Sequence, residues 1–336
     1  MPLRHPAQDI ADLVIQTIVL RFRHPLAIRR AFVQRKDIDR LRPCRSILFP
    51  YKRTGTRVPD FARPRTVEEA TRLLAGGGWR PLAGGTDLYP AAGAGLAARV
   101  LDLTGLKELT EITFGDDLRI GAAVSWSTIA ESDLPSGLRA LQQAARVIGG
   151  RQVQNAGTIG GNLCNASPAA DGVPPLLACG ALVELLSASG RRQLPLAEFL
   201  LGPRRTGLAP DEVMAAVILP RAGQAGRSAF AKLGARSHLV ISIAMVAART
   251  VVEAGRITDA SVAVGACSPV ALRLARVEAA LLGAPLGLAL TRITADDVVA
   301  PLAPIDDVRA TAAYRRAVAL ELVHRAVAEA LAGSAP

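Results

Sequence analysis

Two short segments place adjacent glycines among small polar residues in a chain that is half hydrophobic. The first is AGGTD at residues 83–87, and the second is TIGGN at residues 158–162. Glycine pairs allow positive φ and remove the Cβ atoms that would keep a ligand away from backbone N–H groups. The side chains of Thr86, Thr158 and Asn162 add further hydrogen-bonding groups. Together the segments predict a backbone cradle for an anionic group such as a pyrophosphate, with two ordinary turns as the alternative.

Other phosphate-binding motifs are absent or lack their context. The chain has no G-x-x-x-x-G-K-[ST] sequence, which the phosphate loop of nucleotide-hydrolysing enzymes requires. GAGLAA at residues 93–98 fits a loose G-x-G-x-x-A, but it follows Pro90 and two alanines rather than an expected strand. A dinucleotide fingerprint needs a strand directly before it, so we reject this motif.

The apolar pattern after residue 58 indicates alternating helices and strands. Thr66 and Glu69 have the spacing of a capping box, which marks the start of a helix. GDD at residues 115–117 has the composition of a tight turn between two strands. The elements expected in this part are a helix at 67–74, extended segments at 81–85 and 98–104, two strands within 111–124, and a helix at 138–148.

The pattern of apolar residues changes near residue 225. Residues 239–267 have the pattern of two long strands that turn at Ala254 and Gly255, and residues 311–331 have a helical pattern. The sequence therefore predicts an α+β protein with one domain at 58–222 and a smaller domain at 226–332, which contains an antiparallel sheet and C-terminal helices.

The net charge of +11 is concentrated at the N-terminus. Of the 40 basic and 29 acidic side chains, 13 and 4 lie in residues 1–57, which leaves 27 and 25 in the rest of the chain. A nearly neutral body argues against nucleic-acid binding. We expect residues 1–57 to be a disordered extension or to precede the true start, although a basic arm for an acidic partner is the alternative. No apolar run reaches the ~20 residues of a membrane span.

The cysteines are far apart. Cys44, Cys164, Cys179 and Cys267 form no C-x-x-C pair and do not cluster with the histidines. This spacing excludes an iron–sulfur or structural zinc site, so we expect no metal site in this chain. Unpaired cysteines fit a reducing, cytoplasmic location. An organic cofactor would have to carry any redox chemistry.

Four segments together resemble a known family. PLAGGTDL, NAGTIGGNLCNASPAAD, FAKLGARSH and DDVRATAAYRRAV follow one another in this order. This pattern resembles the medium, FAD-binding subunit of the molybdenum hydroxylases, which include xanthine dehydrogenase, carbon monoxide dehydrogenase and 4-hydroxybenzoyl-CoA reductase. The resemblance covers about residues 59–331. It implies a two-subdomain FAD-binding domain of the PCMH type, followed by a C-terminal domain of the carbon monoxide dehydrogenase flavoprotein type.

The resemblance also assigns residues to the cofactor. It implies that both glycine segments wrap the FAD pyrophosphate, that Ile159 lies near the isoalloxazine, and that Asp171 and Lys232 contribute to the flavin site. A helix N-cap is the alternative for Asp171, and a solvated strand residue is the alternative for Lys232. Because AGGTD contains no His or Cys, we expect non-covalent FAD. We expect no catalytic side chain, because the flavin itself performs the chemistry. The candidate cofactor-binding residues are Ala83, Gly84, Gly85, Thr86, Asp87, Thr158, Ile159, Gly160, Gly161, Asn162, Asp171 and Lys232.

Partners follow from the same resemblance. A small [2Fe–2S] subunit and a large molybdopterin-binding subunit are implied, with the flavin passing electrons between the clusters and an external acceptor. A dimer of such heterotrimers is compatible with it. Two alternatives stay open: a stand-alone flavin-dependent oxidase or reductase, and a non-catalytic adaptor that uses the basic arm.

Overall fold

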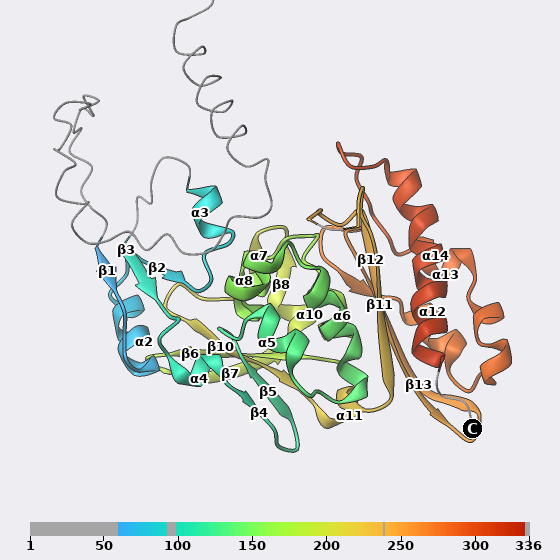
Figure 1. Ribbon diagram of the computed structural model, residues 1–336, viewed down its shortest axis with the longest axis horizontal. Helices are drawn as coiled ribbons and strands as arrows, with labels where there is room; N and C mark the ends of the chain where they lie inside the picture. The colour runs from blue at the N-terminus through green and yellow to red at the C-terminus, as the bar shows by residue number, and fades with distance from the viewer. Residues whose placement is uncertain (1–59, 93–98, 238, 333–336) are drawn as a thin grey trace, which may run out of the picture. The chain divides into compact units, whose positions relative to one another are not determined.

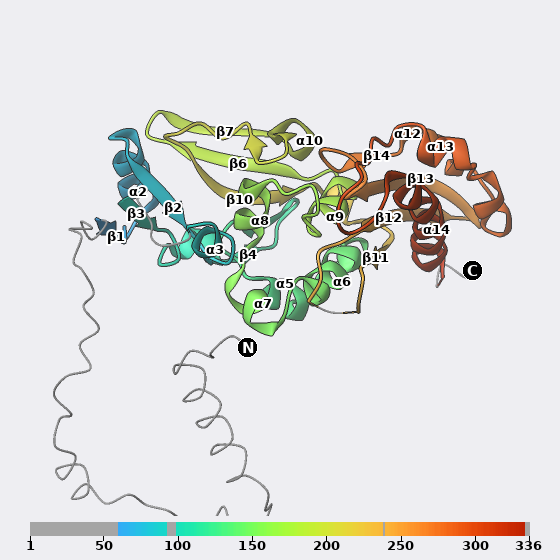
Figure 2. The same cartoon turned by 90° about the horizontal axis from the view of Figure 1, so that it is seen from above.

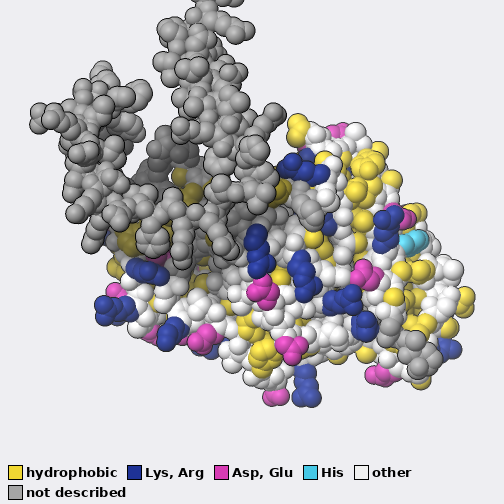
Figure 3. All heavy atoms as spheres, in the orientation of Figure 1, with side chains coloured by type: hydrophobic (Ala, Val, Ile, Leu, Met, Phe, Trp, Pro, Cys, Tyr) yellow, Lys and Arg dark blue, Asp and Glu magenta, His cyan; other side chains and the backbone are white. Residues whose placement is uncertain are grey.

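The computed structural model describes residues 60–92, 99–237 and 239–332. The basic extension expected at 1–57 and the rejected GAGLAA motif lie outside the described residues. Within them, no helix combines the length and apolar character that crossing a membrane requires. On the face drawn in Figure 3, basic and acidic side chains are interspersed over the described surface.

A small parallel sheet opens the described chain, with strands in the order β1–β3–β2. The predicted first helix is confirmed as α2 (Val67–Ala75), because the Thr66 hydroxyl accepts from the Glu69 N–H at 3.2 Å. The Glu69 carboxylate accepts from the N–H of Arg65. The strands are β1 (Phe61–Ala62), β2 (Trp79–Leu82) and β3 (Arg99–Asp102), and α3 (Leu88–Ala91) follows β2.

A five-stranded antiparallel sheet forms the centre of this domain, in the order β4–β5–β10–β6–β7. The predicted hairpin around residues 115–117 is confirmed as β4 and β5. The strands are β4 (Ile112–Thr113), β5 (Leu118–Gly121), β6 (Leu182–Ser187), β7 (Gly190–Pro195) and β10 (Val213–Leu219), and β8 (Leu200–Gly202) pairs separately with β9 (Arg205–Thr206).

The central strand β10 is buried on both faces. Val213 and Ala215 pack with α2 and the parallel sheet, whereas Met214 and Val217 face a larger core. Side chains of a β-strand alternate between its faces, and the β-bulge between Met214 and Ala216 shifts this alternation, so one apolar strand serves two layers. Figure 2 shows helices along one side of this sheet. The helices of the domain are α4 (Lys107–Thr110), α5 (Trp126–Glu131), α6 (Arg139–Val147), α7 (Arg151–Ala156), α8 (Ile159–Asn165), α9 (Val173–Ala178), α10 (Leu196–Phe199) and α11 (Arg221–Gln224).

The C-terminal domain contains a four-stranded antiparallel sheet in the order β11–β12–β13–β14. The predicted turn is confirmed: Ala254 and Gly255 have φ of 48° and 72°, as a two-residue hairpin turn of type I′ requires. The strands are β11 (Arg227–Leu233), β12 (Ala244–Glu253), β13 (Arg256–Gly265) and β14 (Leu272–Arg273), and the helices are α12 (Ala275–Leu281), α13 (Ala295–Val299) and α14 (Ala312–Leu331).

This sheet is covered on both faces, which explains its long uninterrupted apolar strands. Val246 and Ala248 pack in a core with α14, whereas Met245 and Ala247 pack with α6 and α9 of the preceding domain. Figure 1 shows strands of this sheet between α14 and α6. The sheet therefore lies between the C-terminal helix α14 and the helices α6 and α9, which precede and follow the second glycine segment.

Arg315 fixes the start of α14. Its side chain is buried, and its Nη1 atom donates to the Ile243 carbonyl at 2.5 Å and the Ala266 carbonyl at 3.1 Å. Its Nη2 atom donates to Asp307 Oδ1 at 2.7 Å. Burial alone would raise the pKa of Asp307, but hydrogen bonds from Arg309 and the backbone hold the pKa below its usual range.

We expect Arg315→Leu to lower the free energy of unfolding by about 3 kcal/mol, because the buried carbonyls of Ile243 and Ala266 lose their side-chain donor and Asp307 loses one of its donors. Arg325→Leu is the control, since Arg325 is exposed on the same helix and pairs only with Glu321. Its cost should be about 0.5 kcal/mol or less. Urea unfolding of both variants measures the difference, and equal values would contradict the anchoring role.

Candidate functional site

The first glycine segment leaves the carboxyl end of β2. Gly85 has φ of 70°, a left-handed conformation that favours glycine. Gly84 is required for a different reason, because a Cβ there would lie 1.7 Å from the Ala156 carbonyl oxygen. Among the described residues, no acceptor binds the N–H groups of Gly84, Gly85, Thr86 or Asp87. This segment therefore presents the consecutive free donors that the sequence predicts.

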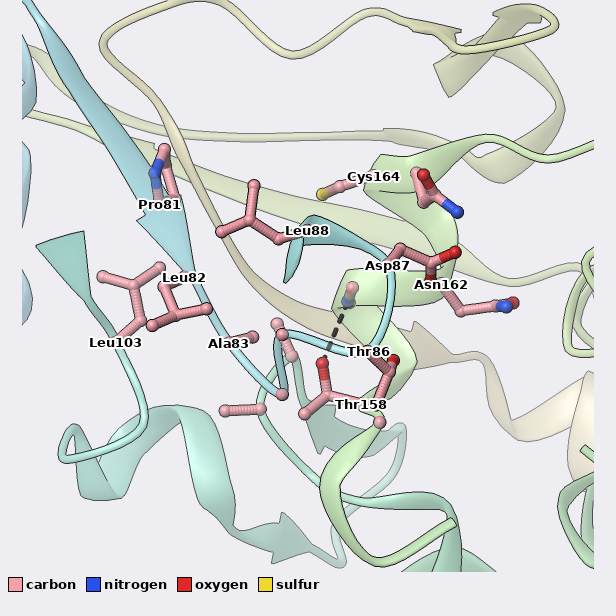
Figure 4. A pocket seen from close by; sticks show the side chains of 18 of the residues that line it. Pro81, Leu82, Ala83, Thr86, Asp87, Leu88, Leu103, Thr158, Asn162 and Cys164 are labelled. Carbon is pink, nitrogen blue, oxygen red and sulfur yellow. Dashed lines mark hydrogen bonds between the residues drawn. The ribbon is translucent and has the colours of Figure 1, made fainter. Parts of the chain in front are cut away.

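The second glycine segment differs from the expectation. It is the first turn of α8, capped by Thr158, whose hydroxyl accepts from the Gly161 N–H at 3.0 Å (Figure 4). The Ile159 N–H donates to the Val124 carbonyl, and the Gly160 N–H donates to the Ala122 carbonyl at 2.8 Å. Helix capping and packing therefore engage these N–H groups in this structure, and the role of the segment in holding the pyrophosphate stays a prediction.

Close packing explains Gly160 instead. A Cβ on this residue would lie 2.6 Å from the Cβ of Ala122, so the glycine lets α8 approach the chain that follows β5. Neither Gly160 nor Gly161 has a positive φ. The groups that this segment offers to a ligand are consequently polar side chains, above all the amide of Asn162.

A cavity of about 410 Å³ lies between the two glycine segments. Leu82, Leu88 and Leu103 form an apolar part of its wall, and Thr86 and Thr158 contribute hydroxyl groups (Figure 4). All predicted site residues line it except Ile159, Asp171 and Lys232.

One buried polar atom in this cavity has no partner. Asn162 Oδ1 is buried without a hydrogen bond to the described residues. Buried polar atoms in proteins are almost always satisfied, so an orphan beside a cavity indicates a ligand group. With the free N–H groups of the first segment, the lining suits a cofactor that has a polar, anionic part and an apolar part.

Ile159 lies elsewhere than the sequence prediction suggests. Its side chain is fully buried in the main hydrophobic core and does not line the cavity. In this structure Ile159 anchors α8 through packing, and its N–H is bound to Val124.

Asp171 and Lys232 form a buried pair next to Asn162. Lys232 Nζ lies 2.5 Å from Asp171 Oδ2, and the fully buried Ser242 hydroxyl donates to Asp171 Oδ1 at 2.5 Å. Asn162 Oδ1 lies 3.0 Å from the position of a Cβ on Gly172, the residue that follows Asp171. Neither Asp171 nor Lys232 lines the cavity between the glycine segments.

The two alternative interpretations, a helix N-cap for Asp171 and a solvated strand residue for Lys232, both fail. Gly172, not Asp171, is the N-cap of α9, and Lys232 is largely buried rather than solvated. Burial raises the pKa of Asp171, while the charge of Lys232 and the hydrogen bonds from Lys232 and Ser242 act in the opposite direction.

Several lining residues were not foreseen from the sequence. Trp126 is almost fully buried, lines the cavity and contacts the positions of Gly157 and Gly172. Cys164 also lines it, and burial raises the pKa of its thiol to about 12, so it stays neutral. No local pattern marks these residues, because they reach the cavity only through the packing of α5 and α8.

Glu212 lines the cavity, and its carboxylate forms an ion pair with Arg192. Arg192 donates to both carboxylate oxygens, at 2.6 and 2.7 Å, and the Ala209 N–H donates to one of them. The hydrogen bond from Arg192 lowers the pKa of Glu212, so this carboxyl group is ionised at neutral pH.

Family comparisons cover nearly all of the described chain. A family described as "FAD binding domain in molybdopterin dehydrogenase" matches residues 55–222. A second, described as "CO dehydrogenase flavoprotein C-terminal domain", matches residues 229–330.

Individual proteins agree with these matches. The putative xanthine dehydrogenase FAD-binding subunit of Escherichia coli K12 is 31% identical, over 82% of this chain and 98% of that protein. The nicotinate dehydrogenase FAD-subunit of Eubacterium barkeri is 38% identical, over 68% and 80%. The structure of carbon monoxide dehydrogenase from Hydrogenophaga pseudoflava is similar with a TM-score of 0.75 at 30% identity, over 82% of this chain and 97% of that chain.

Glu212→Gln should make the free energy of unfolding depend less on pH in the acidic range. The pKa of Glu212 in the folded chain is lowered from its ordinary value of 4.5. Its ionised carboxylate therefore stabilises the folded state above pH 4.5, and this stabilisation is lost as the pH falls through the lowered pKa. Because Arg192 is half exposed, we expect the variant to be about 1 kcal/mol less stable at neutral pH and equal to the wild type in strong acid. Unfolding curves over a pH series measure this. Glu198→Gln, an exposed residue on α10, is the control, and a constant difference across pH would refute the assignment.

Proposed function

The chain belongs to the FAD-binding medium subunits of the molybdenum hydroxylases, and from this membership we propose which residues hold the flavin and which proteins complete the enzyme. It is the FAD-binding, electron-transfer subunit of an oxidoreductase. The fold is the one expected from the resemblance: an FAD-binding domain followed by a domain with an antiparallel sheet and a C-terminal helix.

The pyrophosphate lies on the first glycine segment in this proposal. The free N–H groups from Gly84 to Asp87 are the observation that carries it, because they supply several hydrogen bonds to one anion without a basic side chain. Thr158 and Asn162 add polar side chains from the opposite wall. Gly160 acts by letting α8 come close enough to form that wall, and the N–H of Gly161 is held by the Thr158 cap.

Asp171 and Lys232 hold the flavin end of the site in our proposal. Their burial beside Asn162, and the Ser242 hydroxyl on the same carboxylate, fix their geometry before the cofactor binds. Bound FAD supplies reversible uptake and release of electrons, and the chain supplies binding, orientation and exclusion of water.

FAD is bound without a covalent link in this proposal. The first glycine segment contains neither His nor Cys. The thiol that lines the cavity, Cys164, stays protonated because of its raised pKa, and a neutral thiol is a poor nucleophile.

The partners are proposed to be a small [2Fe–2S] subunit and a large molybdopterin-binding subunit. Relatives include the nicotine 6-hydroxylase medium subunit of Paenarthrobacter nicotinovorans and the carbon monoxide dehydrogenase medium chain of Hydrogenophaga pseudoflava, whose names place each in an assembly of several chains. A dimer of heterotrimers is the assembly we favour. A cytoplasmic location fits the unpaired Cys164, Cys179 and Cys267.

Gly84→Ala should weaken FAD binding by roughly tenfold or more, because the added methyl group pushes the two glycine segments apart. Gly287→Ala is the matched control, since a Cβ at Gly287 meets nothing within 4 Å. Flavin absorbance of the purified chain and of its heat-released supernatant measures both the binding and the absence of a covalent link. A wild-type chain that takes up no FAD would contradict the assignment of this cavity.

Co-expression with the two partner subunits separates the proposal from a stand-alone flavoenzyme. We expect the chain to co-purify with both, and its reduced flavin to appear only when they and their substrate are present. Turnover of a substrate by the FAD-loaded chain alone would favour the stand-alone oxidase or reductase instead.

A further inference from the structure

A second cavity, of about 660 Å³, is lined in part by Lys232 and shares no lining residue with the cavity between the glycine segments. Its walls come from α6 and from the end of β11 with the segment after it. The lining residues are Gln143, Arg146, Val147, Phe230, Lys232, Leu233, Gly234, Arg236 and Ser237.

Two arginine residues that line this cavity are exposed, and each guanidinium group is hydrogen-bonded to a backbone carbonyl. Arg146 Nη2 donates to the Ala130 carbonyl at 2.8 Å. Arg236 donates to the Leu239 carbonyl from Nε at 3.1 Å and from Nη2 at 2.5 Å. These carbonyl contacts hold each side chain while leaving its remaining N–H donors free.

The charges of these two groups are not neutralised locally. Among the described residues, no carboxylate lies within ion-pair distance of Arg146 or Arg236. The acidic groups nearby are already engaged: Asp171 pairs with Lys232. Glu329 accepts from Gln143 and pairs with Arg139. The cavity therefore keeps an excess of about two positive charges.

The remaining wall is apolar. Val147, Phe230 and Leu233 lie beside the cationic groups, so the cavity has room and a suitable surface for more than a bare ion. A phosphate monoester carries about two negative charges at neutral pH, and guanidinium groups match its oxygens in a bidentate manner.

We propose that this cavity is a second ligand site, which binds a phosphate monoester with a compact apolar or aromatic body between Arg146 and Arg236. The site is separate from the FAD cavity, and it does not require that Lys232 contact the flavin. A ligand bound here would lie against Lys232, whose ammonium group pairs with Asp171.

Calorimetric titration of the FAD-loaded full chain at constant ionic strength tests this site, with inorganic phosphate and phenyl phosphate as probes. Both should bind, with phenyl phosphate several times tighter because it also covers the apolar wall. Arg146→Gln and Arg236→Gln should each weaken binding by about tenfold, since one charge-assisted contact is lost. Arg256→Gln is the matched control, because Arg256 is also exposed and held by a carbonyl, that of Gly283.

Three outcomes would overturn the proposal. Absence of heat with both probes, or equal binding by all three variants, would mean that the cavity is not an anion site. Competition of phosphate with FAD in the cofactor-free chain would assign the cavity to the flavin itself. Flavin absorbance recorded on the same samples keeps a failure of FAD binding distinguishable from a failure of this site, and thermal unfolding of each variant checks its fold.

Discussion

The carboxylate of Asp171 is the group on which the arrangement of the two domains depends. It lies at the end of the second glycine motif, is almost completely buried, and would be costly there without compensation. Hydrogen bonds from Lys232 and Ser242 stabilise this carboxylate, and these residues are 61 and 71 positions further along the chain. These two residues flank the segment between β11 and β12, so one carboxylate holds both ends of that segment against the flavin domain.

The sheet of the C-terminal domain supports this contact from behind. Its strand β12 packs α14 on one face and α6 and α9 on the other, which makes the domain boundary a continuous core. The cavity between the glycine segments and the second cavity share no lining residue, and Lys232 lines only the second. The two cavities differ in chemistry, since the first presents free backbone N–H groups and the second presents guanidinium groups.

The glycines of the cofactor motifs show how one residue type meets three physical needs. Gly85 supplies a left-handed turn, Gly84 allows one loop to touch the backbone of another, and Gly160 allows a helix to approach a strand end. Only the first of these needs is conformational. The other two concern distances between segments that are far apart in the sequence, so they become visible only in the folded chain.

Much of the fold and the family membership followed from the sequence alone. Capping at Thr66, the turn at Ala254 and Gly255, and the apolar periodicity of the last helix are local properties, and local propensity decides them. The family resemblance likewise rests on contiguous residues. The sequence could not show that Ile159 enters the core, that Trp126 and Glu212 line the cavity, or that the N–H groups after Thr158 are consumed by Ala122 and Val124. Those features arise where separate segments compete for the same space and the same hydrogen bonds, and only tertiary packing decides that competition.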